Sequence, residues 1–122
     1  MKLQESGENY LETILILKQK LGYVRAIDVA TELNFSKPSV SRAIGILKND
    51  GYIVVEANGN ICLTEEGMKK ASSVYDRHVT LTRYLSEVLG VDPQVAESDA
   101  CRIEHIISEE TFSKIKESLE AN

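Results

Sequence analysis

The sequence lacks the features that mark membrane-spanning and secreted proteins. No apolar run approaches the roughly 20 residues needed to cross a bilayer, and the N-terminal stretch MKLQESGENY has no apolar core of a secretory signal. There are only two cysteines, Cys62 and Cys101, and they form no CxxC pair. We therefore expect a cytoplasmic protein with two free thiols, a disulfide between them being the alternative.

Catalytic motifs are also missing. The chain has no HExxH sequence and no glycine-rich loop that would cradle a substrate. Its 122 residues and 43% apolar content suit one compact unit, or a small domain with a helical extension. We expect no enzyme and no small-molecule substrate.

The net charge of -5 argues against a nucleic-acid partner, but the charge is unevenly distributed. Residues 1–75 hold nine Lys/Arg and nine Asp/Glu, whereas residues 76–122 hold five Lys/Arg and ten Asp/Glu. A neutral front half and an acidic back half indicate two tasks. The predicted domains are residues 1–75 and residues 76–122, linked by a helix over about 65–89.

The spacing of apolar residues predicts three helices in the first half, near 6–21, 26–33 and 37–50. The short turn Leu33-Asn34-Phe35 separates the second helix from the third, and Ser36 is the expected N-cap of the third. The residues predicted to face inward are Tyr10, Leu11, Ile14, Leu17 and Leu21, then Ala26, Val29, Ala30 and Leu33, then Val40, Ile44 and Leu47.

The segment YIVVEANGNICLT then alternates in hydrophobicity, which predicts a β-hairpin with Asn58-Gly59 as its tight turn. Three helices followed by a hairpin form a winged helix-turn-helix, a fold that binds DNA. The expected fold class is mainly α with a small β-hairpin wing. An N-terminal winged helix-turn-helix DNA-binding domain precedes a helical domain, for which the motifs described below predict metal binding and dimerisation.

The second half is predicted to be helical throughout. Thr64 caps the helix over 65–89, Asp92-Pro93 starts a helix that runs through Ile107, and Ser108 caps the last helix. The expected apolar stripe of the long helix is Met68, Ala71, Tyr75, His78, Leu81, Leu85 and Leu89, and that of the last helix is Phe112, Ile115 and Leu119.

The third helix has the side chains of a recognition helix, which presents short polar groups and cations to the major groove. Arg42 can donate two hydrogen bonds to a guanine edge, and Ser39 can hold a phosphate with the helix N-terminus. There are two alternatives to a DNA-reading helix. The segment could be an ordinary capped helix with a solvated polar face, or the winged domain could bind protein. The candidate DNA-binding residues are Ser36, Lys37, Pro38, Ser39, Ser41 and Arg42.

The stretch ACRIEHIIS places Cys101, Glu104 and His105 at helical spacings i, i+3 and i+4, so they project from one side. A thiolate, a carboxylate and an imidazole together suit a divalent transition metal. A polar helix face with a chance cysteine is the alternative. The other histidine, His78, lies in an apolar stripe, where it is either a hydrogen-bonded core residue or another ligand.

The blocks GENYLETILIL, SKPSVSRAIGILKNDGYI, YDRH and ACRIEHIIS, in this order and spacing, resemble the diphtheria toxin repressor family of metal-dependent transcriptional repressors, specifically its short manganese-transport-regulator branch. The resemblance covers almost the whole chain. It implies a homodimer that binds a palindromic double-stranded DNA operator when loaded with Fe²⁺ or Mn²⁺ and represses metal-uptake genes. The implied metal ligands are Asn9, Glu12, His78, Cys101, Glu104 and His105.

The chain departs from that family at three positions. Asn9 replaces the methionine of the iron branch and the aspartate of the manganese branch, Cys101 follows the iron branch, and Thr82 replaces a second-site carboxylate. A Cys/Glu/His set also binds Zn²⁺ or Co²⁺ tightly in vitro, so the available ion would decide which metal is bound. The alternative function is a winged-helix regulator controlled by another ligand or by protein contacts, without metal sensing.

Overall fold

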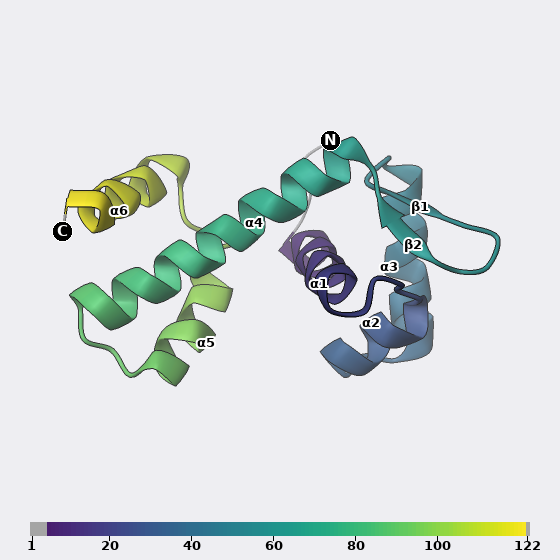
Figure 1. Cartoon of the computed structure of the whole chain (residues 1–122), viewed down its shortest axis with the longest axis horizontal. Coiled ribbons are helices and arrows are strands. Elements are labelled where there is room, and N and C mark those ends of the chain that lie inside the picture. The colour runs from purple at the N-terminus through teal and green to yellow at the C-terminus, as the bar shows by residue number, and fades with distance from the viewer. Residues whose placement is uncertain (1–4, 122) are drawn as a thin grey trace. The chain divides into compact units, whose positions relative to one another are not determined.

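The computed structural model describes residues 5–121, which form two compact units that divide between Ser72 and Ser73 (Figure 1). The division lies inside helix α4 (Glu65–Arg83), as does the boundary after residue 75 expected from the charge distribution. No helix in the described part of the chain has the length and apolar character of a membrane span.

The first unit contains α1 (Glu5–Leu21), α2 (Ala26–Leu33) and α3 (Lys37–Asn49), which pack on one apolar core with the hairpin of β1 (Ile53–Val55) and β2 (Ile61–Leu63) (Figure 1). Leu21 was predicted to face inward but is 56% exposed. The last residues of α1 and the loop that follows, residues 19–23, are all exposed. Ala26 and Leu33 are only partly buried. The predicted residues that are buried are Tyr10, Leu11, Ile14, Leu17, Val29, Ala30, Val40, Ile44 and Leu47.

The turn between α2 and α3 is fixed by backbone conformation. Asn34 adopts the left-handed conformation (φ 57°), and Phe35 N–H donates to Ala30 O at 3.1 Å, which ends α2. Ser36 then caps α3, as predicted, because its Oγ accepts from Ser39 N–H at 3.3 Å. The position and start of α3 are therefore set by residues 34–39.

The hairpin forms where predicted, with Ile53 paired to Leu63 and Val55 to Ile61. Its turn is longer than the two-residue turn expected at Asn58-Gly59. Glu56 N–H donates to Asn60 O, and Gly59 N–H donates to Glu56 O, both at 2.9 Å. Of the residues in this turn, 57–59, only Gly59 has a positive φ (90°). This is typical of a three-residue loop that ends in a left-handed glycine.

In the second unit, α4 continues into a π-helical turn, η1 (Tyr84–Val88), which the sequence did not predict. Leu89 N–H donates to Tyr84 O, five residues back, so Leu89 is rotated off the expected stripe and is 58% exposed. The stripe was also displaced earlier in α4: Val74 is buried, whereas Tyr75 and Met68 are exposed.

Two further helices complete this unit, α5 (Pro93–Ile103) and α6 (Glu109–Ala121). Their predicted caps are confirmed, since Asp92 accepts from the backbone of residues 94 and 95, and Ser108 Oγ accepts from Thr111 N–H. α5 was expected to reach Ile107 but ends at Ile103, and residues 104–106 form a turn.

Candidate metal centre and nucleic-acid interface

A fully buried carboxylate in the second unit contacts two imidazole rings. Glu104 Oε2 lies 3.0 Å from His78 Nδ1, and Glu104 Oε1 lies 3.3 Å from His105 Nε2. The side chain of Glu104 is 0% exposed, that of His105 is 3% exposed, and that of His78 is 20% exposed. His78 comes from α4, Glu104 is the C-cap of α5, and His105 comes from the turn after α5.

The environment of the buried Glu104 carboxylate favours the binding of a cation. Removing a carboxylate from water is costly unless a positive charge or several hydrogen bonds compensate for it. Glu104 Oε1 accepts no hydrogen bond of acceptable geometry from residues 5–121. One carboxylate and two imidazoles are donors that divalent transition metals prefer, so the residues present suit such an ion.

The spacing predicted that Cys101, Glu104 and His105 project from one side of a helix, and in the structure the three residues differ in secondary structure and in burial. Cys101 lies in α5, Glu104 is the C-cap of that helix with helical backbone angles, and His105 lies in the turn that follows. Cys101 is exposed, whereas Glu104 is buried. Cys101 and His78 nevertheless line one pocket of about 430 Å³, together with Gln94 and Glu97. The thiol and this ring therefore face the same hollow.

The other proposed ligands lie on α1 in the first unit. Asn9 and Glu12 are three positions apart and so share a face of the helix. Asn9 is half-buried, whereas Glu12 is only 6% exposed. A glutamate so deeply buried requires compensation, as Glu104 does.

Thr82 replaces a carboxylate of the resembled family and has a structural contact here. Its Oγ1 donates to His78 O at 2.7 Å. The hydroxyl therefore shares the His78 carbonyl with the helical backbone, and it is a weaker metal ligand than a carboxylate.

Arg77, which was not among the predicted site residues, contacts the turn that carries Glu104 and His105. Its Nη1 donates to Glu104 O at 3.1 Å. The available signal was its position beside His78 in the block YDRH. Arg77 precedes His78 on α4 and binds the backbone of Glu104. It therefore connects the segments that carry two of the proposed ligands.

The candidate DNA-reading face of α3 is open to solvent. Lys37, Ser41 and Arg42 are exposed and form no hydrogen bond or ion pair with the residues that the structure describes. Pro38 and Ser39 are exposed as well. Ser36 differs, because its hydroxyl donates to Ser39 Oγ at 2.9 Å while it caps the helix.

Ile46, which the sequence analysis did not single out, lies on the same side of α3 one turn after Arg42 and is 53% exposed. The signal was its absence from the inward stripe of Val40, Ile44 and Leu47. An exposed isoleucine beside a cationic and polar face can contact an apolar group of a partner.

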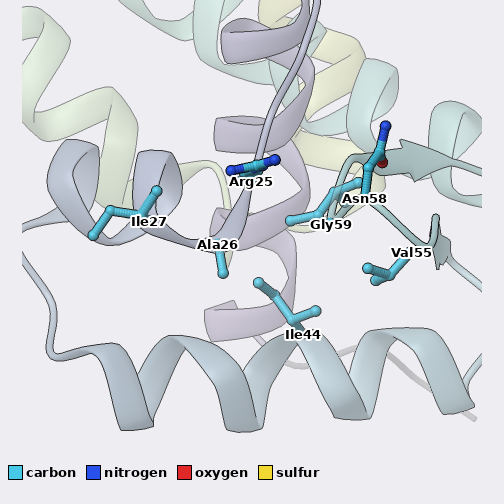
Figure 2. Close-up of a pocket in the computed structure, with 8 residues that line it drawn as sticks. Arg25, Ala26, Ile27, Ile44, Val55, Asn58 and Gly59 are labelled. Atoms are coloured by element: carbon cyan, nitrogen blue, oxygen red, sulfur yellow. The ribbon is translucent and has the colours of Figure 1, made fainter.

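A hollow of about 460 Å³ lies between the start of α2, α3 and the hairpin (Figure 2). Its labelled side chains include Arg25, Ile44 and Val55, one from each of these elements. Arg25 Nε donates to Tyr23 Oη, which donates to Asn58 O, both at 2.9 Å. This network links the hairpin loop to the start of α2 and holds the Arg25 guanidinium over the Tyr23 ring, 5.2 Å from its centroid.

Two family models match nearly the whole chain. Residues 2–60 match the iron dependent repressor N-terminal DNA binding domain, and residues 64–121 match the iron dependent repressor metal binding and dimerisation domain. The matched domains and the similar proteins are those of transcriptional regulators and not of enzymes.

Similar proteins agree with these matches. An uncharacterised HTH-type transcriptional regulator of Methanocaldococcus jannaschii is 33% identical over 93% of this chain and 92% of its own length. The transcriptional regulator MntR of Escherichia coli is 35% identical over 93% of this chain and 72% of its own. The crystal structure of IdeR from T. acidophilum is 27% identical with a TM-score of 0.83, over 98% of this chain and 55% of that one.

The chain therefore spans about half the length of the IdeR structure and almost the full length of the Methanocaldococcus jannaschii relative. The winged helix-turn-helix lies in the part that matches the DNA binding domain, and the helical second unit lies in the part that matches the metal binding and dimerisation domain. The protein belongs to the iron-dependent repressor family of metal-dependent, DNA-binding transcriptional regulators.

Proposed function

We propose that this repressor senses Fe²⁺ or Mn²⁺ and, as a homodimer, binds a palindromic operator of metal-uptake genes. The observation that carries the proposal is the buried Glu104 carboxylate in contact with His78 and His105. A metal ion would supply the positive charge that this carboxylate lacks in a dry environment.

The proposed ligands are the two histidines and Glu104, with Cys101 from the adjoining pocket and two residues of α1. Support for Cys101 is that it shares a hollow with His78, and support for Glu12 is its deep burial. Asn9 would offer an amide oxygen, a weaker donor than a carboxylate. The full proposed set is Asn9, Glu12, His78, Cys101, Glu104 and His105.

The choice of ion follows from the softness of the donors. A thiolate favours Fe²⁺, Co²⁺ and Zn²⁺ over Mn²⁺, whereas carboxylate and amide oxygens suit Mn²⁺. Because this set mixes both kinds, Zn²⁺ and Co²⁺ should also bind in vitro, and the physiological ion would be selected by availability.

Dimerisation is supported by the exposed apolar side chains of the second unit. Val79, Leu89 and Val95 are 39%, 58% and 50% exposed, and a second copy would remove them from water. A palindromic site requires two recognition helices about 34 Å apart. Sedimentation at micromolar concentration should give a dimer, and a monomer both with and without metal would contradict the proposal.

On DNA, the exposed face of α3 would enter the major groove. Arg42 would read a base edge, and Lys37, Ser39 and the start of the helix would hold phosphates. Ser36 would act mainly through the cap that it forms, since its hydroxyl is already hydrogen-bonded to Ser39. Pro38 and Ser41 complete the proposed reading face.

The test is binding of the full chain to its own promoter DNA, first with chelator and then with Fe²⁺, Mn²⁺, Zn²⁺ or Co²⁺. We expect metal to tighten binding, and Cys101→Ala to reduce that effect. Cys101→Glu should shift the preference from softer ions toward Mn²⁺. Cys62→Ala is the matched control, because Cys62 is the only other thiol and lies outside the proposed site.

Equal affinity in chelator and in every metal would reject metal sensing. It would favour the alternative of a winged-helix regulator controlled by another ligand or by protein contacts. A Cys62→Ala effect as large as that of Cys101→Ala would show that thiol loss acts through folding and not through the proposed site.

A further inference from the structure

One arginine binds the turn that carries two of the proposed metal ligands. Arg77 Nη1 donates to Glu104 O and to Ile107 O, both at 3.1 Å. Its Nη2 donates to Glu109 Oε2 at 2.8 Å. The guanidinium also lies 5.4 Å from the centroid of the Phe112 ring, and the side chain is only 20% exposed.

These hydrogen bonds fall at the end of α5 and in the turn that follows it. α5 ends at Ile103, whose carbonyl accepts from the N–H groups of residues 106 and 107 at 3.0 and 2.9 Å. The carbonyls of Glu104 and Ile107 lie beyond the helix, and both accept from Arg77. The guanidinium supplies two N–H donors and places a positive charge at a helix C-terminus. Arg77 therefore fixes the backbone of the Glu104–Ile107 segment.

The same helix contributes a proposed ligand. His78 follows Arg77 on α4, and its Nδ1 lies 3.0 Å from Glu104 Oε2. Arg77 thus holds the Glu104 backbone to α4, while the Glu104 carboxylate reaches the neighbouring residue of α4. The separation between the His78 ring and the Glu104 and His105 side chains depends on this attachment.

We propose that Arg77 is a positioning residue for the metal site, which sets the placement of Glu104 and His105 relative to His78 before an ion binds. The inference rests on the proposed function, because it requires these three residues to be ligands. Ligands held in place lose less conformational freedom on binding and discriminate better between ions of different preferred geometry.

The competing explanation is that Arg77 only attaches α6 to α4. Its contacts with Glu109 and Phe112 serve that role, whereas its hydrogen bonds to the two carbonyls do not involve α6. Variants that remove each kind of contact separately can therefore distinguish positioning of the ligands from attachment of the last helix.

The experiment measures the affinity of the full-length chain for Co²⁺, Mn²⁺ and Zn²⁺, and the visible absorption spectrum of the Co²⁺ form. Arg77→Lys keeps the charge but loses the planar fork that reaches both carbonyls and Glu109. Glu109→Gln removes the ion pair and keeps the carbonyl hydrogen bonds. Phe112→Leu weakens the packing of α6 and leaves all three hydrogen bonds in place.

We expect Arg77→Lys to lower metal affinity about tenfold or more, to narrow the ratio of Zn²⁺ to Mn²⁺ affinity, and to alter the Co²⁺ spectrum. Glu109→Gln and Phe112→Leu should change affinity by less than about twofold. Unfolding of the metal-free proteins is followed in parallel, so that lost stability is measured separately from lost metal affinity.

An unchanged spectrum and affinity in Arg77→Lys would overturn the proposal. An equal loss in Phe112→Leu would also overturn it, since the effect would then follow the packing of α6. His105→Ala tests the underlying site: if it binds metal as the wild type does, the proposed ligands are wrong and the positioning role falls with them.

Discussion

His78 Nδ1 lies 3.0 Å from Glu104 Oε2, although 26 positions separate the two residues in the chain. The contact joins α4 to the end of α5 within the second unit. It places a buried carboxylate where a hydrogen bond compensates for only part of its charge. A site of this kind is costly without a cation, and this cost is the physical basis for coupling metal binding to the state of the protein.

The substitution Glu104→Gln should separate stability from metal response. It keeps the shape of the side chain and removes the buried charge, so the free energy of unfolding in chelator should rise by about 1 kcal/mol. Metal at a hundred times its Kd should stabilise the wild type by about 2.7 kcal/mol and the variant by much less. Urea unfolding with chelator and with Mn²⁺ checks both values. A variant that keeps the full metal response would contradict the assignment of Glu104 as a ligand.

Arg42 and Arg25 should affect DNA binding in different ways. Arg42→Ala should cost about 1–3 kcal/mol and relax sequence preference, because a guanine edge loses its partner.

Arg25 lies beside the hairpin loop at the start of α2. Arg25→Ala should weaken binding to all duplexes alike and reduce the salt slope by about one, as loss of a phosphate contact does. Affinities on operator and random duplexes across a salt series distinguish the two; equal losses for Arg42→Ala on both duplexes would show that it contacts only phosphate.

Ile46 should contribute to reading thymine. It is 53% exposed on the side of α3 that bears Arg42, and the thymine methyl is the apolar group of the major groove. On an operator obtained by selection from random duplexes, replacing the contacted thymine by deoxyuridine should weaken wild-type binding about fourfold, the worth of one buried methyl group. Ile46→Ala should bind both duplexes equally. An identical deoxyuridine effect in wild type and variant would remove Ile46 from the reading face.

Two helical glycines should respond oppositely to alanine. At Gly67 an added Cβ would collide with the Tyr52 carbonyl, which accepts from Thr64 N–H where α4 starts. Gly67→Ala should destabilise the protein by about 1–3 kcal/mol. At Gly45, inside α3, a Cβ would meet nothing within 4 Å, and Gly45→Ala should stabilise it by about 0.4–1 kcal/mol. Urea unfolding of the two variants measures the difference, and a neutral Gly67→Ala would mean that the start of α4 can move away.

Local features of the chain could be predicted because their causes are local. The caps at Ser36, Asp92 and Ser108 depend on hydrogen bonds to residues two or three positions away. The inward stripe of α3 follows from helical periodicity, and the hairpin follows from alternation. The order of these elements was sufficient to predict the winged helix-turn-helix, which the family matches confirm.

Features that depend on residues distant in sequence were not predictable in the same way. The sequence predicted that this helix runs to Ile107, but α5 ends at Ile103, and the Arg77 guanidinium binds the carbonyls of Glu104 and Ile107 that follow. The π-helical turn at Tyr84–Val88 likewise turned Leu89 outward. The end of a helix depends on which groups outside it satisfy the last carbonyls, and periodicity carries no information on those groups.

The sequence by itself thus determined the types of side chain available to the site and the helices that carry them. Only the tertiary structure decided that Glu104 is buried against His78 and His105 while Cys101 is exposed. The physical reason is that residue type and spacing fix donor chemistry and helical face, whereas the cost of a buried charge depends on the packing of segments far apart in the chain.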